Sequence, residues 1–156
     1  MAIQFRPAQL SDLETVVTLM ADFYSGEQLP FDAADAQATL IALIQTPHYG
    51  GIWLIQNAGP REGQHAGQTI GYLALCIGYS LEYKGPDAFL DELYLQPSYR
   101  RQGIGTQAIA FAEATCRARR IRALHLEVEH RNLKAQKFYK KTGYELHDRA
   151  LMTKWL

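Results

Sequence analysis

The chain has 156 residues, 47% of them hydrophobic, which fits one globular domain over residues 1–156 and excludes a disordered chain. No apolar run approaches the roughly 20 residues of a membrane span, and the first residues lack the pattern of a secretory leader. We therefore expect a cytoplasmic protein without a membrane partner, in which Cys76 and Cys116 are reduced.

The formal net charge of zero conceals an asymmetry along the chain. Residues 1–95 carry 11 acidic and 3 basic side chains, whereas residues 96–156 carry 5 acidic and 13 basic ones. Either surface charge is simply unevenly distributed, or the first half favours a cation and the second holds a polyanion. The basic residues are not interleaved with aromatic ones as in a known nucleic-acid module, so we expect no nucleic acid partner.

The first half of the chain predicts three strands and two helices. "SDLE", Ser11–Glu14, has the form of a capping box at the start of the first helix. A long polar connection, Asn57–Gln68, separates two strands that should pair with each other. The predicted elements are strands at Ile3–Arg6, Gly51–Asn57 and Thr69–Tyr83, with helices after Ser11 and near Asp32–Gln45.

The second half predicts one strand–helix–strand crossover, from Asp87 to Glu129, which should be parallel and right-handed. Most other strand neighbours should be antiparallel. The fold class is therefore α/β, with a mixed, mostly antiparallel twisted sheet flanked by helices. The predicted elements are strands at Asp87–Leu95, Ala123–Glu129, Tyr144–His147 and Leu151–Trp155, with a helix at Gly103–Arg119 and another through Lys141 that Gly143 ends.

The turn "RRQGIG", Arg100–Gly105, favours an anion. The free amides at the start of a helix carry positive partial charge, and glycines let a phosphate approach the backbone. The two arginines add full charges. A tight turn that merely needs glycine is the structural alternative.

Gly103, Gly105 and Ala108 also fit the dinucleotide fingerprint G-x-G-x-x-A, and Glu127 lies where a ribose-binding acid is expected. The residues PSYRRQ, Pro97–Gln102, stand between the strand and this fingerprint, however, and only about fifty residues follow it. The chain also offers no second run of strand–helix units, so a dinucleotide-binding enzyme is the weaker alternative.

Two motifs resemble those of the GNAT superfamily of N-acetyltransferases. "LYLQPSYRRQGIG" is similar to the family's acetyl-CoA motif, and "NLKAQKFYKKTGY", Asn132–Tyr144, is similar to its second motif. The order of predicted elements also matches the family across nearly the whole chain. The resemblance implies an acetyl-CoA-dependent N-acetyltransferase acting on a small-molecule or peptide amine. A GNAT-fold module that binds CoA without transfer activity is the other possibility.

The resemblance also implies where acetyl-CoA is held, between parallel strands that splay apart near Leu95 and Val128. The pantetheine arm would follow the backbone of the first strand, the pyrophosphate would lie on the glycine turn, and Asn132 and Ala135 would face the pantetheine. The residues implied are Leu93, Tyr94, Leu95, Arg100, Arg101, Gln102, Gly103, Ile104, Gly105, Thr106, Asn132, Ala135 and Tyr139.

Acyl transfer to an amine needs a base for the ammonium and an acid for the departing thiolate. Tyr139 matches the family's usual acid. The base is Asp91, Glu92 or Glu127: the first two are placed like an acidic pair in polyamine acetyltransferases, and the third resembles a position in acetyltransferases of ribosomal protein N-termini. Because Asp91 and Glu92 are adjacent in a strand, we expect their side chains on opposite faces. The pair is favoured over Glu127.

Two further expectations concern metals and assembly. His125 and His130 lack partners at a metal-site spacing, so we expect no metal. The apolar residues from Tyr144 to Leu156, together with the family's habit, suggest a homodimer.

Overall fold

The computed structural model describes residues 2–59 and 67–156, which form two compact units: one ends at Leu126 and the other begins at Glu127. The middle of the predicted polar connection, residues 60–66, lies outside the described residues.

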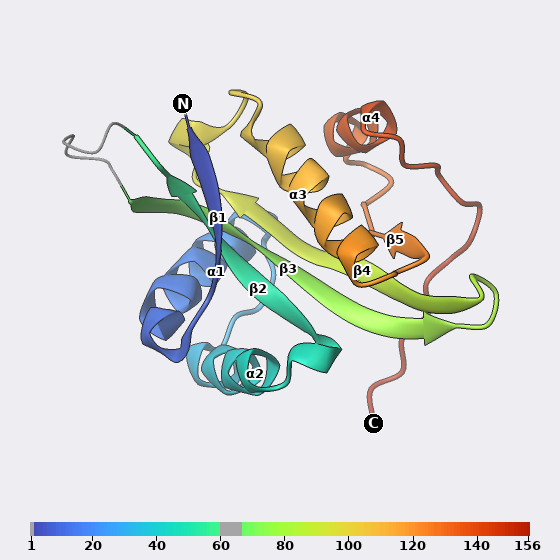
Figure 1. Ribbon diagram of the computed structural model, residues 1–156, viewed down its shortest axis with the longest axis horizontal. Coiled ribbons are helices and arrows are strands. Elements are labelled where there is room, and N and C mark those ends of the chain that lie inside the picture. The colour runs from blue at the N-terminus through green and yellow to red at the C-terminus, as the bar shows by residue number, and fades with distance from the viewer. Residues whose placement is uncertain (1, 60–66) are drawn as a thin grey trace. The chain divides into compact units, whose positions relative to one another are not determined.

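The first unit is built on a five-stranded sheet whose strands lie in the order β1-β2-β3-β4-β5 (Figure 1). Every pair is antiparallel except β4 and β5, which are parallel. The mixed sheet with one parallel pair is therefore confirmed. The strands are β1 Ile3–Pro7, β2 Gly50–Asn57, β3 Gln68–Ser80, β4 Gly85–Leu95 and β5 Ala123–His125.

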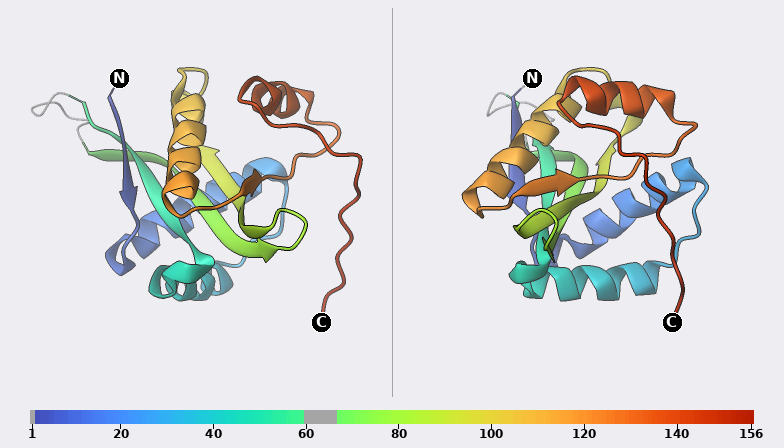
Figure 2. Two further views of the ribbon diagram at one scale, coloured as in Figure 1. Left: turned by 45° about the vertical axis from the view of Figure 1, so that its right-hand side comes forward. Right: turned by 90° about the vertical axis from the view of Figure 1, so that its right-hand side faces the viewer.

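Helices cover both faces of this sheet, α1 and α2 on one and α3 on the other (Figure 2). Alternation along β2 explains the two layers, because Leu54 packs in the core of the α1–α2 face whereas the ring of its neighbour Trp53 meets Phe111 of α3. The helices are α1 Leu13–Glu27, α2 Ala33–Gln45 and α3 Ile104–Ala118. They match the predicted helices to within a few residues at each end.

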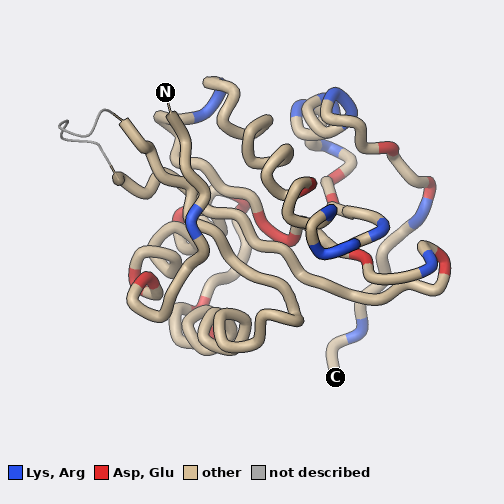
Figure 3. The backbone as a smooth tube through the Cα atoms, viewed as in Figure 1, with Lys and Arg blue, Asp and Glu red and all other residues tan. Residues whose placement is uncertain are grey.

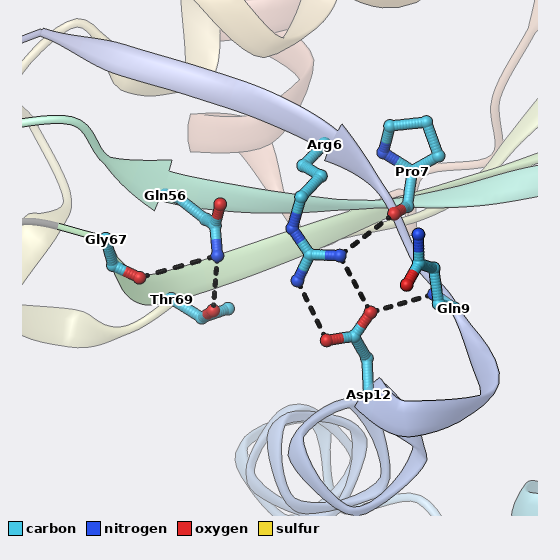
Figure 4. A network of polar contacts seen from close by, with 7 residues as sticks. All are labelled: Arg6, Pro7, Gln9, Asp12, Gln56, Gly67 and Thr69. Carbon is cyan, nitrogen blue, oxygen red and sulfur yellow. Dashed lines mark hydrogen bonds and ion pairs between the residues drawn. The ribbon is translucent and has the colours of Figure 1, made fainter.

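The start of α1 differs from the prediction. A 3-10 turn, Leu10–Asp12, precedes the helix, and Asp12 rather than Ser11 organises it. The Asp12 carboxylate accepts a hydrogen bond from the Gln9 amide at 2.8 Å and two from the Arg6 guanidinium at 2.8 and 2.9 Å (Figure 4). The predicted Ser11 cap is thus wrong. Asp12 forms the contacts at this helix start instead, because its carboxylate binds Arg6 of β1 and the Gln9 amide.

β4 contains one residue more than the stretch of β3 with which it pairs. Glu92 pairs with Ala74 of β3 and Leu90 pairs with Leu75, so Asp91 has no counterpart in the ladder. This is a β-bulge, which interrupts the regular alternation of side chains and often lies beside an active site.

The second unit contains one helix, α4 Leu133–Lys141, capped at its start by the Asn132 side chain. Gly143, with φ of 95°, follows its end as predicted. The two strands predicted after it are absent, since residues 144–156 form no strand in the structure. Their sequences favour extended backbone, but a strand also needs a neighbour to pair with. For the same reason β5 ends at His125 rather than Glu129, where its pairing with β4 ends.

Candidate active site

The predicted anion-binding turn joins β4 to α3 within the first unit. Arg101 and Gly103 both have left-handed backbone, with φ of 62° and 79°. No side chain in the described chain caps α3. A Cβ built on Gly103 would meet no atom within 4 Å, so the backbone here faces open space. The start of α3 thus has no side-chain cap and lies beside open space at Gly103, an arrangement that suits an anion.

The two arginines of this turn differ in their surroundings. The Arg100 Nε donates to the Leu95 carbonyl at 2.8 Å, and its guanidinium lies 5.5 Å from the centre of the Tyr94 ring. Arg100 thus braces the turn against the end of β4. Both arginines are exposed, so the charge of each is accessible to an anion.

The edge of β4 that faces β5 is paired along only part of its length. The parallel pairing covers Asp87 to Phe89 alone, and no strand among the described residues pairs with the edge from Leu90 to Leu95. An unpaired edge can bind another extended chain by backbone hydrogen bonds. The predicted cofactor residues Leu93, Tyr94 and Leu95 lie on this segment, which leads directly toward the glycine turn.

The bulge brings Asp91 and Glu92 to the same face of the sheet, so the prediction of opposite faces was wrong. Glu92 contacts Tyr24 of α1, which places it on the α1–α2 face. Asp91 lies close enough to Cys76 to raise the pKa of its thiol, and Cys76 lies two residues beyond Ala74, the partner of Glu92. A regular strand would separate two adjacent side chains, whereas the extra residue in a bulge turns both the same way.

Glu92 is held by two tyrosines that the sequence did not single out. Its Oε1 accepts from the Tyr24 hydroxyl and its Oε2 from the Tyr72 hydroxyl, each at 2.7 Å. Burial raises the pKa of Glu92 above its ordinary value, while the two hydroxyls act to lower it and Asp91 raises it further. Tyr24 is 68 positions from Glu92 in the sequence, so only the packing of α1 on the sheet reveals the contact.

Asp91 is exposed and lies beside a thiol of low reactivity. Burial, and after it the Asp91 carboxylate, raise the pKa of Cys76 to about 11. The thiol therefore remains protonated at neutral pH and is a poor nucleophile. Both cysteines are free, as predicted.

The second unit contains the remaining predicted residues. The Asn132 Oδ1 accepts from the Ala135 amide at 3.1 Å, which leaves its NH₂ group as the donor for any ligand. The Tyr139 ring lies 5.1 Å from that of Phe138 and 5.7 Å from that of Tyr144. Burial raises the pKa of the Tyr139 phenol. Glu127 is exposed.

The described residues form neither a cluster of metal ligands nor the sheet of a doubly wound dinucleotide-binding fold. These hold no group of three or more histidine, cysteine or carboxylate side chains that could ligate a metal ion. The sheet has a single parallel pair, whereas a doubly wound dinucleotide fold needs a mostly parallel sheet. Within the same residues no helix is long and apolar enough to cross a membrane.

An open strand edge, an acid pair and a turn with an uncapped helix start thus lie along or directly after one strand. Residues 15–144 match the model of the acetyltransferase (GNAT) family, most of the chain's length. The protein therefore belongs to this family, and the resemblance seen in its two motifs is confirmed.

Individual relatives agree with this assignment. The chain is 27% identical over 143 residues to thialysine N-epsilon-acetyltransferase of Bos taurus, covering 90% of this chain and 83% of the relative. An integron cassette protein from the mobile metagenome of Cole Harbour Salt Marsh has a TM-score of 0.81 and 30% identity, over 98% of this chain and 90% of that one. A predicted acetyltransferase of Clostridium acetobutylicum, solved with acetyl-CoA, has a TM-score of 0.79 and 16% identity, over 98% and 96%.

Proposed function

We propose that this protein transfers an acetyl group from acetyl-CoA directly to a primary amine of a cationic small molecule or peptide. The observation that carries the proposal is the bulge of β4, which places two carboxylates on one face of the strand that leads into the anion-binding turn. A donor thioester and an acceptor amine would thus be served by a single strand.

Acetyl-CoA fits the first unit on two observations. The turn from Arg101 to Thr106 offers uncapped helix amides beside open space at Gly103, which suits the pyrophosphate. The unpaired edge at Leu93–Leu95 suits the amides of the pantetheine arm. When bound, the cofactor supplies the activated acetyl group. Within the second unit, the NH₂ group of Asn132 is the donor that we propose for the pantetheine, since its Oδ1 is occupied by the Ala135 amide.

Glu92 is the proposed base. A carboxylate must be ionised to accept a proton yet basic enough to hold it, and burial moves the pKa of Glu92 toward neutrality. Exposed Asp91 would hold the ammonium form of the acceptor by charge. Glu127 stays as the alternative base, and Tyr139 is the proposed acid for the departing thiolate.

The charge of the site indicates the class of acceptor. Figure 3 shows acidic residues along α1, α2 and β4, and none of these three elements contains a lysine or arginine. A negative surface attracts a cationic substrate and raises its local concentration. The bovine relative is named for transfer to the side-chain amine of thialysine, which is such a cation at neutral pH.

The test is a broad panel of primary amines assayed for release of free CoA, with wild-type protein, Glu92→Gln, Asp91→Asn and Glu127→Gln. We expect Glu92→Gln to lower kcat by roughly 10²–10⁴. Asp91→Asn should chiefly raise KM for the amine, and Glu127→Gln should change neither constant.

Two results would contradict parts of this proposal. Tight acetyl-CoA binding without transfer to any amine would favour a CoA-binding module that has lost activity. A large loss of kcat in Glu127→Gln, with Glu92→Gln unaffected, would move the base to the second unit.

A further inference from the structure

The contacts around Glu92 suggest roles for two side chains outside both family motifs. Tyr24 lies in α1 and Tyr72 in β3, and each donates one hydrogen bond of 2.7 Å to a different oxygen of the carboxylate. The carboxylate is therefore fixed from two sides. The side chain of Glu92 has three carbon–carbon bonds that would otherwise rotate, so the contacts determine where its oxygens lie.

We propose that Tyr24 and Tyr72 are positioning residues, whose hydroxyls hold Glu92 as an ionised carboxylate aimed at the acceptor amine. The inference rests on the proposed function, since it takes Glu92 as the base. In this proposal neither tyrosine exchanges a proton with the substrate. They act through Glu92, by fixing its orientation and by favouring its charged form.

The chemistry of the three groups determines that the two tyrosine hydroxyls donate and that the Glu92 carboxylate accepts. An ionised carboxylate only accepts hydrogen bonds, and two phenol hydroxyls only need to donate to it. A hydrogen bond to a charged group is shorter and stronger than one between neutral groups. Burial raises the pKa of Glu92, and the two hydroxyls counteract this by stabilising the carboxylate. Without them, Glu92 would spend more of its time protonated and unable to accept a proton.

The two tyrosines are not equivalent in their surroundings. Tyr72 is 1% exposed and belongs to the core of the α1–α2 face, so its ring is held in place by packing on all sides. Tyr24 is partly exposed near the end of α1, and its ring meets that of Phe31 edge-on at 5.3 Å. Tyr24 therefore also ties the end of α1 to β4, beside the exposed Asp91.

The test uses Tyr24→Phe and Tyr72→Phe, which remove one hydroxyl each and keep the ring. The matched control is Tyr49→Phe, which removes a hydroxyl from an exposed tyrosine in the turn before β2. For each protein, kcat/KM of the best amine is measured from pH 5 to 9. The ionisation of Glu92 is followed separately by infrared difference spectroscopy, with Glu92→Gln identifying its carboxylate band.

We expect both variants to move the acidic limb of kcat/KM to higher pH, because a carboxylate that loses a donor binds its proton more tightly. On the acidic limb, where most of the protein carries a protonated Glu92, the loss should be about threefold to tenfold per hydroxyl, the range of one hydrogen bond to a buried group. It should shrink toward the alkaline plateau. The infrared titration should shift in the same direction, and Tyr49→Phe should match the wild type in both.

The outcomes separate the two levels of the proposal. A pH-independent loss in Tyr24→Phe, with the Glu92 titration unmoved, would overturn the positioning role. A wild-type protein inactive toward every amine would overturn the proposed function, and the infrared titration would still decide whether the hydroxyls hold the carboxylate. Tyr72 is buried and its variant is the one at risk of unfolding, so Tyr24→Phe alone is sufficient for the decision.

Discussion

At the scale of single residues, the site depends on contacts between distant parts of the chain as well as on local motifs. Gly143 follows the end of α4 with a left-handed backbone, in keeping with its predicted role, and Gly103 lies directly before α3 in the predicted turn. Tyr24 and Tyr72 were not predictable, because their contacts with Glu92 join segments 68 and 20 residues apart. No spacing within a strand or helix carries that information, which arises only when α1 packs on the sheet.

The proposed role of Tyr139 as the acid can be tested by removing its hydroxyl. A phenol with a raised pKa is a weaker acid than an ordinary tyrosine, and the conjugate acid of the departing thiolate has a pKa of only about 8.5, so the proton transfer is uphill and Tyr139 would assist as negative charge develops on the sulfur. Tyr139→Phe should keep the fold and acetyl-CoA binding and lower kcat by roughly 10²–10⁴. Steady-state kinetics measures this, with Tyr79→Phe, an exposed tyrosine at the end of β3, as control. A kcat within about threefold of wild type would exclude Tyr139 as the acid.

Asp12 gives a prediction on stability. Its hydrogen bonds with Arg6 hold the pKa of Asp12 below its ordinary value. A carboxyl with a lowered folded-state pKa stabilises the protein above its unfolded pKa of about 3.9, and this contribution is lost as the pH falls through the folded value. Asp12→Asn should therefore lower the free energy of unfolding by about 1 kcal/mol at pH 7.

Urea unfolding at several pH values checks the sign of this effect. The difference between wild type and Asp12→Asn should narrow as the pH drops below about 4, because wild-type Asp12 then loses its charge as well. Glu113→Gln removes a more exposed ion pair with Arg117 and should cost about 0.3–0.5 kcal/mol at pH 7. Equal losses in the two variants would show that the Arg6 contacts add nothing beyond an ordinary surface pair.

Whole elements were more predictable than their boundaries and their partners. Alternation and helical spacing located all five strands of the sheet and all four helices of the described chain. They could not reveal the bulge in β4, since the residue types of one strand do not show which of its positions lacks a partner in the next strand. They also predicted two final strands, because extended sequence preference says nothing about whether a neighbouring strand is available.

The turn between β4 and α3 can be tested with a control matched for strain. Gly103 and Gly67 have nearly equal φ values, 79° and 80°, and a Cβ on either would meet nothing within 4 Å. Valine at each should therefore lower the free energy of unfolding by a similar amount, about 1–2 kcal/mol. Only Gly103→Val should weaken acetyl-CoA binding, by tenfold or more in calorimetry, because its side chain would occupy the space beside the helix amides. Equal affinity in the two variants would remove the pyrophosphate from this turn.

At the scale of the whole molecule, exposed apolar side chains in the second unit suggest self-association. Leu151, Met152 and Trp155 are all largely exposed, although residues of this kind are usually covered. We predict a homodimer in which a second copy covers them. Light scattering at micromolar concentration should give twice 17.6 kDa for the wild type. Trp155→Glu should give the monomer, and a wild-type particle of 17.6 kDa would contradict the prediction.

The extra residue of β4 also affects how this chain can be shortened and compared with its homologues. Leu90 and Glu92 face consecutive residues of β3, so Asp91 is the one position that the ladder does not need. Its deletion would leave an unbroken antiparallel register, with the other side chains of β4 on their present faces. A homologue without the bulge would therefore align with a one-residue gap at this position. Such a gap would record the loss of one carboxylate from the site, not a displacement of the strand.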